Sequence, residues 1–462
     1  MNLGDVVVVG AGPAGVRAAE TLVQAGLRPV VIDEAARAGG QIYRQPPEGF
    51  VRTKQQLYGF ESRKADDIHR SFERLAGKIV HLPSTLAWNC DGRRLDLLTE
   101  GQYASQRFSH LILCTGATDR VLPFPGWLLP GVYTLGAAQV ALKAQGCVLA
   151  GRVVLVGSGP LLYLLAYQYA KAGARVAAVL DTASFANQTG AAIDLARQPL
   201  TFGKGVYFVA WLRSRGIRVS RGVHDVAVLG DERVQEVSWR VGDRGHRIAC
   251  DAVATGFNLR SETQLADLAG CEFDFDPVDR QWLPRRDAAG RSSVAGVYLA
   301  GDGVGIRGAD AAELAGRRAA LALLEDVGEP TCDRERERLE RALRRSAGFQ
   351  RGLGRAFPLP VAWLRACPDD LVICRCENVR AGELRQAAND GRATEINRLK
   401  ALTRVGMGRC QGRMCAGAAT EILACCTGRP VADVGRLRAQ PPIKPISLMP
   451  APADRPQVQE RA

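Results

Sequence analysis

The sequence predicts an α/β fold with two Rossmann-like dinucleotide-binding domains and a small helical domain near the C-terminus. Three observations indicate this fold. A glycine-rich motif, Gly10–Gly15, directly follows an apolar run, a near repeat of that motif surrounds Gly157 and Gly159, and four cysteines gather between residues 374 and 415. A glycine-rich turn between a strand and a helix is the phosphate-binding element of dinucleotide-binding folds. A chain of 462 residues is also long enough for about two to four domains.

The first unit reads as a strand, a turn, a helix and a second strand. The β-branched run Val6–Val9 suits a strand buried on both faces, and a helix is expected over Val16–Ala25. The helix N-terminus directs free N–H groups at a pyrophosphate. A second strand, Pro29–Ile32, then ends on an acid that is placed to accept hydrogen bonds from ribose hydroxyls. The residues expected to hold an ADP moiety are Gly10, Gly12, Pro13, Ala14, Gly15, Asp33 and Glu34.

Three later segments are expected to complete the same site. A glycine pair at Gly39–Gly40 lets a loop cross close over a cofactor, and the strand His110–Cys114 leads into a Thr-Gly turn. A strand from 296 to 300 ends in a Gly-Asp turn before a helix over Ala309–Leu324. That turn resembles the one in disulfide-reductase-like flavoproteins, whose aspartate contacts the ribityl chain and pyrophosphate of FAD. FAD is therefore the leading ligand, with Gly40, Gln41, Arg44, Thr115, Gly116, Gly301 and Asp302 as further contacts.

The second nucleotide motif departs from the first at one position. Leu162 stands where the third glycine would allow the helix to touch the strand, so the geometry of that site differs from the first. The following strand, Arg175–Leu180, ends at Asp181, which suits a ribose and opposes a 2′-phosphate. Two interpretations of this domain remain open. It is kept for structure or partner contacts, or it binds a nucleotide at Gly157 and Gly159.

The remaining segments set the expected domain boundaries. Residues 48–90 have a polar, helical pattern with a strand at Lys78–Leu82, Asp333–Arg345 reads as a charged helix, and Gly348–Pro360 has the glycine and proline content of an irregular linker. We expect a discontinuous FAD-binding domain (1–120 and 251–325), a second nucleotide-binding-like domain (121–250), a linker (326–369), a cysteine domain (370–430) and an extended tail (431–462).

The cysteine group has the spacing of a cluster-binding domain. Cys374 and Cys376 are separated from Cys410 and Cys415 by a segment that reads as two short helices. Four thiolates on two tight loops can hold a [2Fe–2S] cluster. They also satisfy a structural zinc site, although the one-residue first gap is tight for zinc, and free thiols are the third reading. Cys425 and Cys426 lie late on an apolar helix and are expected to be core residues.

Composition excludes several other classes of protein. The net charge of +13 is spread along the chain without a basic run or interleaved aromatic residues, which argues against nucleic acid as a partner. No apolar run is long enough to span a bilayer. The first core strand is expected to begin at Asp5, and nothing before it resembles a signal peptide. Thirteen cysteines, mostly scattered singly, fit free thiols in a reducing compartment. We therefore expect a cytoplasmic protein without a membrane span.

The motifs GAGPAG, GGQIYR, TGATDRVLPFPG, GSGPLL, GVYLAGDG, ICRCENV and TRVGMGRCQGRMC carry a resemblance. Over residues 5–445 the chain resembles the alpha subunits of multi-subunit, dye-linked amino-acid and opine dehydrogenases. The resemblance implies an oxidoreductase acting on CH–NH donors, with FAD and a [2Fe–2S] cluster. It implies a beta subunit similar to D-amino-acid oxidase, an FMN between alpha and beta and, as a further partner, a small ferredoxin-like gamma subunit. It also leaves ATP or NAD as alternatives to FAD in the first site.

Three functions follow from these expectations. The first is an electron-transfer subunit whose substrate chemistry occurs on another chain, because no constellation for binding an amino acid is evident in the sequence. The second is a stand-alone NADH-dependent flavin/[2Fe–2S] reductase, against which Leu162 argues. The third is a scaffold with vestigial nucleotide sites, which the intact cysteine set disfavours. No catalytic residue is expected in this chain.

Overall fold

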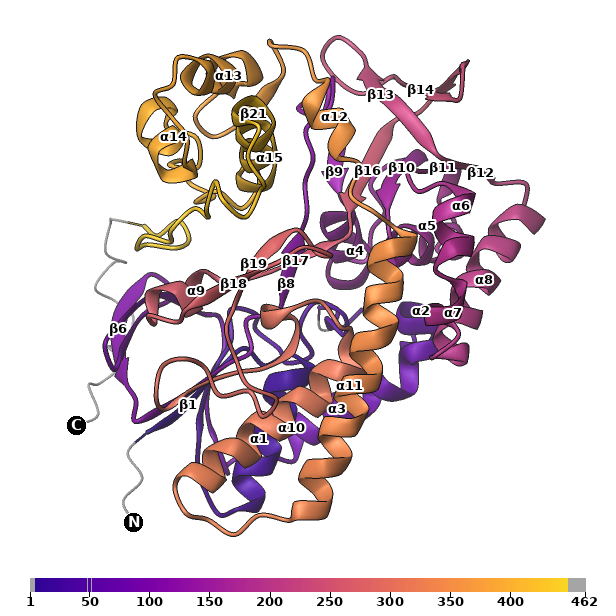
Figure 1. Cartoon of the computed structure of the whole chain (residues 1–462). Coiled ribbons are helices and arrows are strands. Elements are labelled where there is room, and N and C mark those ends of the chain that lie inside the picture. The colour runs from indigo at the N-terminus through magenta and orange to yellow at the C-terminus, as the bar shows by residue number, and fades with distance from the viewer. Residues whose placement is uncertain (1–4, 48, 51, 448–462) are drawn as a thin grey trace.

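A computed structural model describes residues 5–447 apart from Glu48 and Val51. Its first domain contains a five-stranded parallel sheet in the order β20-β7-β1-β2-β3 (Figure 1). Helices α1 and α10 pack against each other beside this sheet, and the valines of β1 are buried on both faces. The bounds are β1 Val6–Val9, α1 Pro13–Gln24, β2 Val30–Ile32, β3 Val80–Leu82, β7 His110–Leu113, β20 Val297–Leu299 and α10 Ala309–Asp326. The expected strand-helix-strand unit is therefore present.

The second domain repeats this architecture. Its parallel sheet has the order β12-β11-β10-β16-β9, and a three-stranded antiparallel sheet, β13-β14-β15, extends from it. The strands are β9 Val132–Thr134, β10 Arg152–Ser158, β11 Arg175–Asp181, β12 Arg218–Arg221, β13 Val223–Leu229, β14 Glu236–Val241, β15 Arg244–Ala249 and β16 Ala252–Phe257. The helices are α4 Leu135–Ala144, α5 Pro160–Lys171, α6 Phe185–Gly190, α7 Ala192–Leu195 and α8 Pro199–Ser214.

The chain passes between the two domains through two short strands that pair with each other. Strand β8, Ala117–Asp119, leads out of the first domain, and β17, Leu259–Ser261, leads back. The two are antiparallel, with Leu259 opposite Asp119. A helix, α9 Gln264–Leu268, and a hairpin of β18 Phe273–Asp276 with β19 Gln281–Pro284 follow the return strand.

The expected helical pattern over residues 48–90 is wrong in its last part. Helices α2 Lys54–Tyr58 and α3 Ser62–Glu73 end well before residue 85, and β4 Thr85–Asp91 begins a three-stranded antiparallel sheet with β5 Arg94–Thr99 and β6 Gln102–Arg107. Strand β6 exposes most of its residues. Its stability comes from pairing with β5, so its own side-chain pattern is a weak signal.

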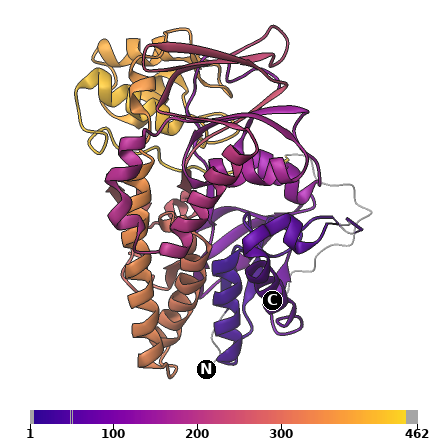
Figure 2. The same cartoon turned by 90° about the vertical axis from the view of Figure 1, so that its right-hand side faces the viewer.

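The expected irregular stretch at Gly348–Pro360 is also wrong over most of its length. Helix α11 runs from Asp333 to Ala356, beside α10 at its start and beside α6 and α7 at its end (Figure 2). A Cβ at Gly352 would lie 2.7 Å from the Cβ of Asp194 in α7. The glycines of this segment therefore permit close helix packing and do not end the helix.

The cysteine domain shares a hydrophobic core with the second domain. It contains α12 Val361–Arg365, β21 Val372–Cys374, β22 Val379–Arg380, α13 Ala381–Asn389, α14 Ile396–Thr403 and α15 Ala416–Thr427. Ile373 and Leu423 belong to the same buried cluster as Val154 and Trp239. Trp127 also donates its indole N–H to the carbonyl of Val372 at 2.9 Å. In Figure 1 its helices α13, α14 and α15 lie above the first domain.

The described part of the tail lies along the first domain. Ile443 is buried, and its N–H bonds to the carbonyl of Trp88 at 3.1 Å. The tail beyond Ser447 lies outside the described residues. Among the residues that are described, no helix combines the length and apolar character needed to cross a bilayer.

Candidate functional site

The first glycine motif forms a turn with no room for side chains. Gly10 has φ of +103°, and a Cβ there would lie 2.3 Å from the carbonyl oxygen of Cys114. A Cβ at Gly15 would lie 1.7 Å from the carbonyl oxygen of Gly10. Helix α1 begins at Pro13, so its free amides face the space above this turn. The backbone is therefore arranged to approach a phosphate closely.

The loop with the second glycine pair crosses directly over this turn. Gly39 donates its N–H to the carbonyl of Ala11 at 2.9 Å. A Cβ at Gly40 would lie 2.9 Å from the Cα of Gly12. The two backbones therefore approach each other closely at Gly12 and Gly40 and form a narrow cradle of the kind that a pyrophosphate fits.

The Asp33 side chain is hydrogen-bonded to the backbone of the glycine turn. One carboxylate oxygen accepts the N–H of Ala11, and the other accepts the N–H of Ala35 at 2.6 Å. Burial raises the pKa of Asp33, against the effect of these two amides. Each oxygen keeps a lone pair for a ribose hydroxyl, so Asp33 fits its expected role and also fixes the turn. Glu34 instead pairs with Lys444 of the tail and is exposed.

The Gly-Asp turn meets the Thr-Gly turn although they are far apart in sequence. A Cβ at Gly303 would lie 2.7 Å from the hydroxyl oxygen of Thr115, and a Cβ at Gly301 would lie 2.9 Å from Ala14. Asp302 accepts the N–H of Arg307 at 2.8 Å and that of Gly308 at 3.1 Å, just before α10. Burial raises the pKa of Asp302. Both halves of the expected dinucleotide site therefore come together.

The loop with Gln41 and Arg44 is held by residues that sequence reasoning missed. Arg44 donates to the side-chain oxygen of Gln41 at 2.9 Å, and the charge of Arg44 acts to lower the pKa of Asp33. Lys143 of α4 donates to the carbonyl of Ile42 at 2.8 Å, and Tyr58 donates to the carbonyl of Arg44 at 2.9 Å. Burial lowers the pKa of Lys143 to about 7. A lysine in an otherwise apolar helix was the only sequence signal for this contact.

The acid of the second nucleotide motif is fully enclosed by its own domain. Asp181 has 0% exposure. It accepts hydrogen bonds from the Tyr163 hydroxyl at 2.5 Å, the Gln188 amide at 3.0 Å and the N–H of Ala183 at 2.9 Å. Burial raises the pKa of Asp181 to about 6. The carboxylate that was expected to face a ribose is therefore engaged by protein groups.

The glycine turn of the second motif is approached by the end of α11. A Cβ at Gly159 would lie 2.2 Å from the side-chain oxygen of Asn258, and Asn258 donates to the carbonyl of Phe357 at 2.9 Å. The ring of Phe357 packs against Tyr163 at a centroid distance of 6.4 Å. Leu162 is completely buried in the same core. The second site is thus filled by its own chain where the first site forms a cradle.

The structure brings the four cysteines together as two pairs. The Cys374 and Cys415 side chains are hydrogen-bonded to each other, and so are those of Cys376 and Cys410. The Cys415 thiol lowers the pKa of Cys374 to about 5, which favours a thiolate there. A Cβ at Gly408 would lie 2.3 Å from the Cβ of Cys376, so that glycine loop crosses tightly over the group.

Backbone amides from both cysteine loops face this group. The N–H groups of Gly406 and Glu377 hydrogen-bond to the Cys374 sulfur. Soft thiolates surrounded by amide donors fit an iron–sulfur cluster. Within the described ranges, no set of three or more His, Cys, Asp or Glu side chains is arranged to ligate a metal ion directly. Cys425 and Cys426 lie on α15, with Cys425 exposed, so they are not both core residues as expected.

A chain of hydrogen bonds joins the two candidate sites. The Thr115 hydroxyl donates to the carbonyl of Glu262 at 2.6 Å, and Arg413 donates to the carboxylate of Glu262 at 2.6 Å. A second nitrogen of Arg413 lies 3.4 Å from the carbonyl oxygen of Cys410. Arg260 lies half-buried beside this path and donates to the carbonyl of Arg413 at 3.1 Å. No sequence pattern pointed to this connection.

Comparisons with known proteins agree with both sites. The model of the pyridine nucleotide-disulphide oxidoreductase family matches residues 4–318, and that of the BFD-like [2Fe-2S] binding domain matches residues 372–425, which contain all four cysteines.

The chain is 36% identical to the A subunit of opine oxidase from Agrobacterium tumefaciens over 96% of this chain and 90% of the relative. It is 37% identical to the HcnB subunit of hydrogen cyanide synthase from Pseudomonas aeruginosa over 96% and 97% of the two chains. The solved L-proline dehydrogenase from P. horikoshii has the same fold, with a TM-score of 0.70, 21% identity and coverage of 96% of this chain and 78% of that chain.

Proposed function

This chain belongs to the pyridine nucleotide-disulphide oxidoreductase family and carries a BFD-like [2Fe-2S] binding domain, and from that premise we propose that it is the electron-transfer alpha subunit of a heteromeric amino-acid or opine dehydrogenase. The oxidation of a C–N bond then occurs on a partner. The full-length similarity to the A subunit of opine oxidase supports this proposal.

The proposed cofactors are FAD in the first domain and [2Fe–2S] in the cysteine domain. A bound flavin takes up two electrons, and the cluster passes on single electrons. Gly12 and Gly40 would enclose the pyrophosphate, Asp33 would accept from the ribose, and Asp302 would orient the ribityl chain. The metal ligands would be Cys374, Cys376, Cys410 and Cys415.

The observation that carries the proposal is the connection between the two sites inside one chain. Thr115 beside the Gly-Asp turn, Glu262 and Arg413 lead to the Cys410 loop through successive hydrogen bonds. These contacts hold the cysteine domain against the first domain at a fixed place. Such an arrangement suits transfer of electrons from a flavin to a cluster.

The second domain is proposed to have a structural role. Asp181 is engaged by Tyr163, Gln188 and its own loop, and Phe357 packs at the glycine turn. An NADH-dependent reductase would need this site open toward the flavin. We therefore propose that NADH is not the electron donor.

The proposed partners are a beta subunit similar to D-amino-acid oxidase and a small ferredoxin-like gamma subunit, with FMN between alpha and beta. The cytoplasm is the proposed location, because all thirteen cysteines are free thiols.

The test uses the chain purified without oxygen, alone and with its co-expressed beta partner. The isolated chain should contain flavin, iron and sulfide, and its visible spectrum should change neither with NADH nor with amino acids or opines. Addition of the partner should restore bleaching by one of these substrates. Rapid bleaching of the isolated chain by NADH would contradict the proposal, and ATP or NAD in place of flavin would contradict the FAD assignment alone.

A further inference from the structure

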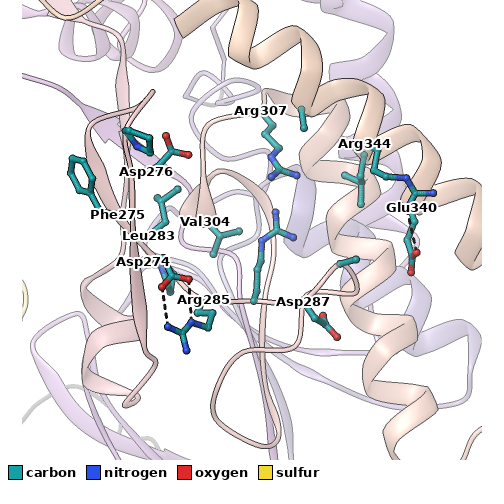
Figure 3. A pocket seen from close by; sticks show the side chains of 16 residues that line it. Asp274, Phe275, Asp276, Leu283, Arg285, Asp287, Val304, Arg307, Glu340 and Arg344 are labelled. Atoms are coloured by element: carbon teal, nitrogen blue, oxygen red, sulfur yellow. Dashed lines mark hydrogen bonds and ion pairs between the residues drawn. The ribbon is translucent and has the colours of Figure 1, made fainter. Parts of the chain in front are cut away.

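A cavity of about 500 Å³ lies on the side of the first domain, next to the segment that follows Asp302. Its walls come from the β18–β19 hairpin, the loop after it, the residues before α10 and the middle of α11 (Figure 3). Phe275, Leu283, Val304 and Leu343 give it apolar walls. No role in the electron-transfer proposal involves this cavity.

Two arginines that line the cavity form no salt bridge with a described residue. Arg286 follows β19 and Arg307 precedes α10. Neither guanidinium has a hydrogen bond or an ion pair to any residue in the part of the chain that the structure describes. Burial and, after it, the charge of Arg307 lower the pKa of Arg286 to about 10, so the two guanidiniums lie close enough to repel each other.

Most of the carboxylates around the cavity are engaged in pairs or turns of their own. Asp274 pairs with Arg285 at 2.9 Å. Glu340 pairs with Arg318 at 2.9 Å. Asp287 accepts two backbone N–H groups of its own turn at 2.9 Å, and its charge offsets only part of the effect on Arg286. These acids flank the cavity in Figure 3.

The fourth carboxylate, Asp276, uses one oxygen to cap its own turn. That oxygen accepts the N–H of Val278 at 2.8 Å and the N–H of Asp279 at 2.9 Å. Its charge raises the pKa of Arg307, as do those of Asp279 and Asp302, but burial outweighs them and the pKa is lowered. The protein thus holds two guanidiniums beside a partly apolar cavity with no hydrogen bond or ion pair from either to a described residue.

We propose that this cavity binds a small organic anion, with Arg286 and Arg307 holding its carboxylate or phosphate oxygens and the apolar walls receiving its carbon skeleton. Two guanidiniums on one anion form charge-assisted, directional hydrogen bonds. The bound anion also removes the repulsion between the two arginines. The ligand class assigned to this cavity is thus a small organic anion, and the cavity is separate from the proposed flavin and cluster sites.

The location of the cavity links it to the flavin site without making it part of that site. The backbone N–H of Arg307 is held by Asp302, whereas Arg286 lies on a different loop. Loss of the Arg286 side chain therefore leaves the Asp302 turn unchanged. A variant at this position separates anion binding from flavin binding.

The test is calorimetric titration of the full flavin-loaded chain at low ionic strength with inorganic phosphate and with succinate. The wild-type chain should bind at least one of the two anions. Arg286→Gln and Arg307→Gln should each weaken binding about tenfold or more, since each removes a charge-assisted contact. Arg247→Gln, which removes an exposed arginine of β15, is the charge-matched control and should bind as the wild type does.

The two probes distinguish the sources of the anion. Binding of succinate alone indicates a carboxylate ligand, binding of phosphate alone a phosphate ester, and mutual displacement a site for the shared oxyanion. Flavin content should stay unchanged in Arg286→Gln, and its thermal midpoint without ligand should not fall, because one of two repelling charges is gone. Failure of both anions to bind the wild-type chain, or equal binding by Arg286→Gln, would overturn the proposal.

Discussion

Arg413 donates a 2.6 Å hydrogen bond to Glu262, and this pair joins the loop of Cys410 and Cys415 to the strand that returns to the first domain. Only 13% of the Arg413 side chain and 10% of the Glu262 side chain are exposed. Burial by itself would raise the pKa of Glu262, but the charge and hydrogen bond of Arg413, together with the charges of Arg260 and Lys444, outweigh it and the pKa is lowered. The contact between the two candidate redox sites thus depends on a buried ion pair.

Glu262→Gln should weaken this contact. The variant leaves the buried guanidinium of Arg413 without its charge partner, a loss of about 1–3 kcal/mol in the free energy of unfolding. Because the folded-state pKa of Glu262 is lowered, its stabilising effect is present above its unfolded pKa and is lost as the pH falls through the folded value. Denaturant unfolding measures the loss at neutral pH. Glu377→Gln, which changes the pair with the exposed Arg404, is the control and should have a smaller effect.

Cys376→Ser should abolish the visible absorption and the iron content of the cysteine domain. A serine hydroxyl is a poor substitute for a thiolate ligand of iron. Cys425→Ser is the matched control, because Cys425 is exposed on α15 away from the paired thiols, and it should keep full iron and sulfide content. Stoichiometric zinc in the wild-type protein would contradict the cluster assignment.

Asp302→Ala should lower flavin occupancy. It removes a carboxylate that holds the N–H groups of Arg307 and Gly308, and the proposed contact to the ribityl chain. A charge-assisted hydrogen bond is worth about 1.5–3 kcal/mol, so binding should weaken roughly tenfold or more. Absorbance of the released flavin measures occupancy. Asp310→Ala removes an exposed acid of the same helix start and should leave occupancy unchanged.

Asp181→Asn should stabilise the protein at neutral pH but not in acid. Burial raises the pKa of Asp181 from 3.8 to about 6, so its contribution to stability is fully present below pH 3.8 and is lost as the pH rises through 6. Asparagine resembles the protonated carboxyl. The gain in unfolding free energy should grow to the order of 3 kcal/mol across this range. The control is Asp231→Asn, which changes an exposed acid. If the difference in unfolding free energy between Asp181→Asn and the wild type does not change with pH, or equals that of the control, Asp181 does not titrate in this way.

Arg260→Gln should lower the reduction potential of the cluster. Arg260 is half-buried, and its pKa is lowered first by burial and further by Arg413, while the charges of Glu262, Cys415 and Cys410 act on it in the opposite direction. Loss of this positive neighbour disfavours addition of an electron to a negatively charged cluster. A redox titration followed by electron paramagnetic resonance measures the shift. Arg375→Gln, next to two ligands in sequence but exposed to solvent, should shift the potential less.

Local patterns explain which parts of the fold the sequence predicts. The unit from β1 to β2 is encoded by adjacent residues, namely an apolar run, three glycines and an acid, and it appears as expected. Strand β6 was missed because its exposed residues are held by pairing with β5. The length of α11 was missed because Gly352 contacts Asp194, a residue remote in sequence, and no local pattern records that contact.

In the candidate sites too, features encoded by adjacent residues could be predicted, and contacts between residues remote in sequence could not. The glycines of the first site could be predicted because their conformations are local requirements of the turn. The enclosure of Asp181 could not, because Tyr163 and Gln188 are common residue types whose approach depends on the packing of α5 and α6. The unpaired state of Arg286 and Arg307 depends on where three separate segments place their carboxylates.

The cysteine domain has a further, mechanical consequence for the molecule. Two short strands, β8 and β17, are the covalent passage between the nucleotide-binding domains, and such a passage is where two domains can rotate about a hinge. The cysteine domain shares its core with the second domain and is bonded to the first through Arg280–Glu421, the tail that follows it is bonded there through Arg436–Asp267, and α11 contacts both domains. It therefore acts as a brace across the hinge. Rotation of the first domain against the second would therefore require the ion pairs at Glu421 and Asp267 and the contacts of α11 to break.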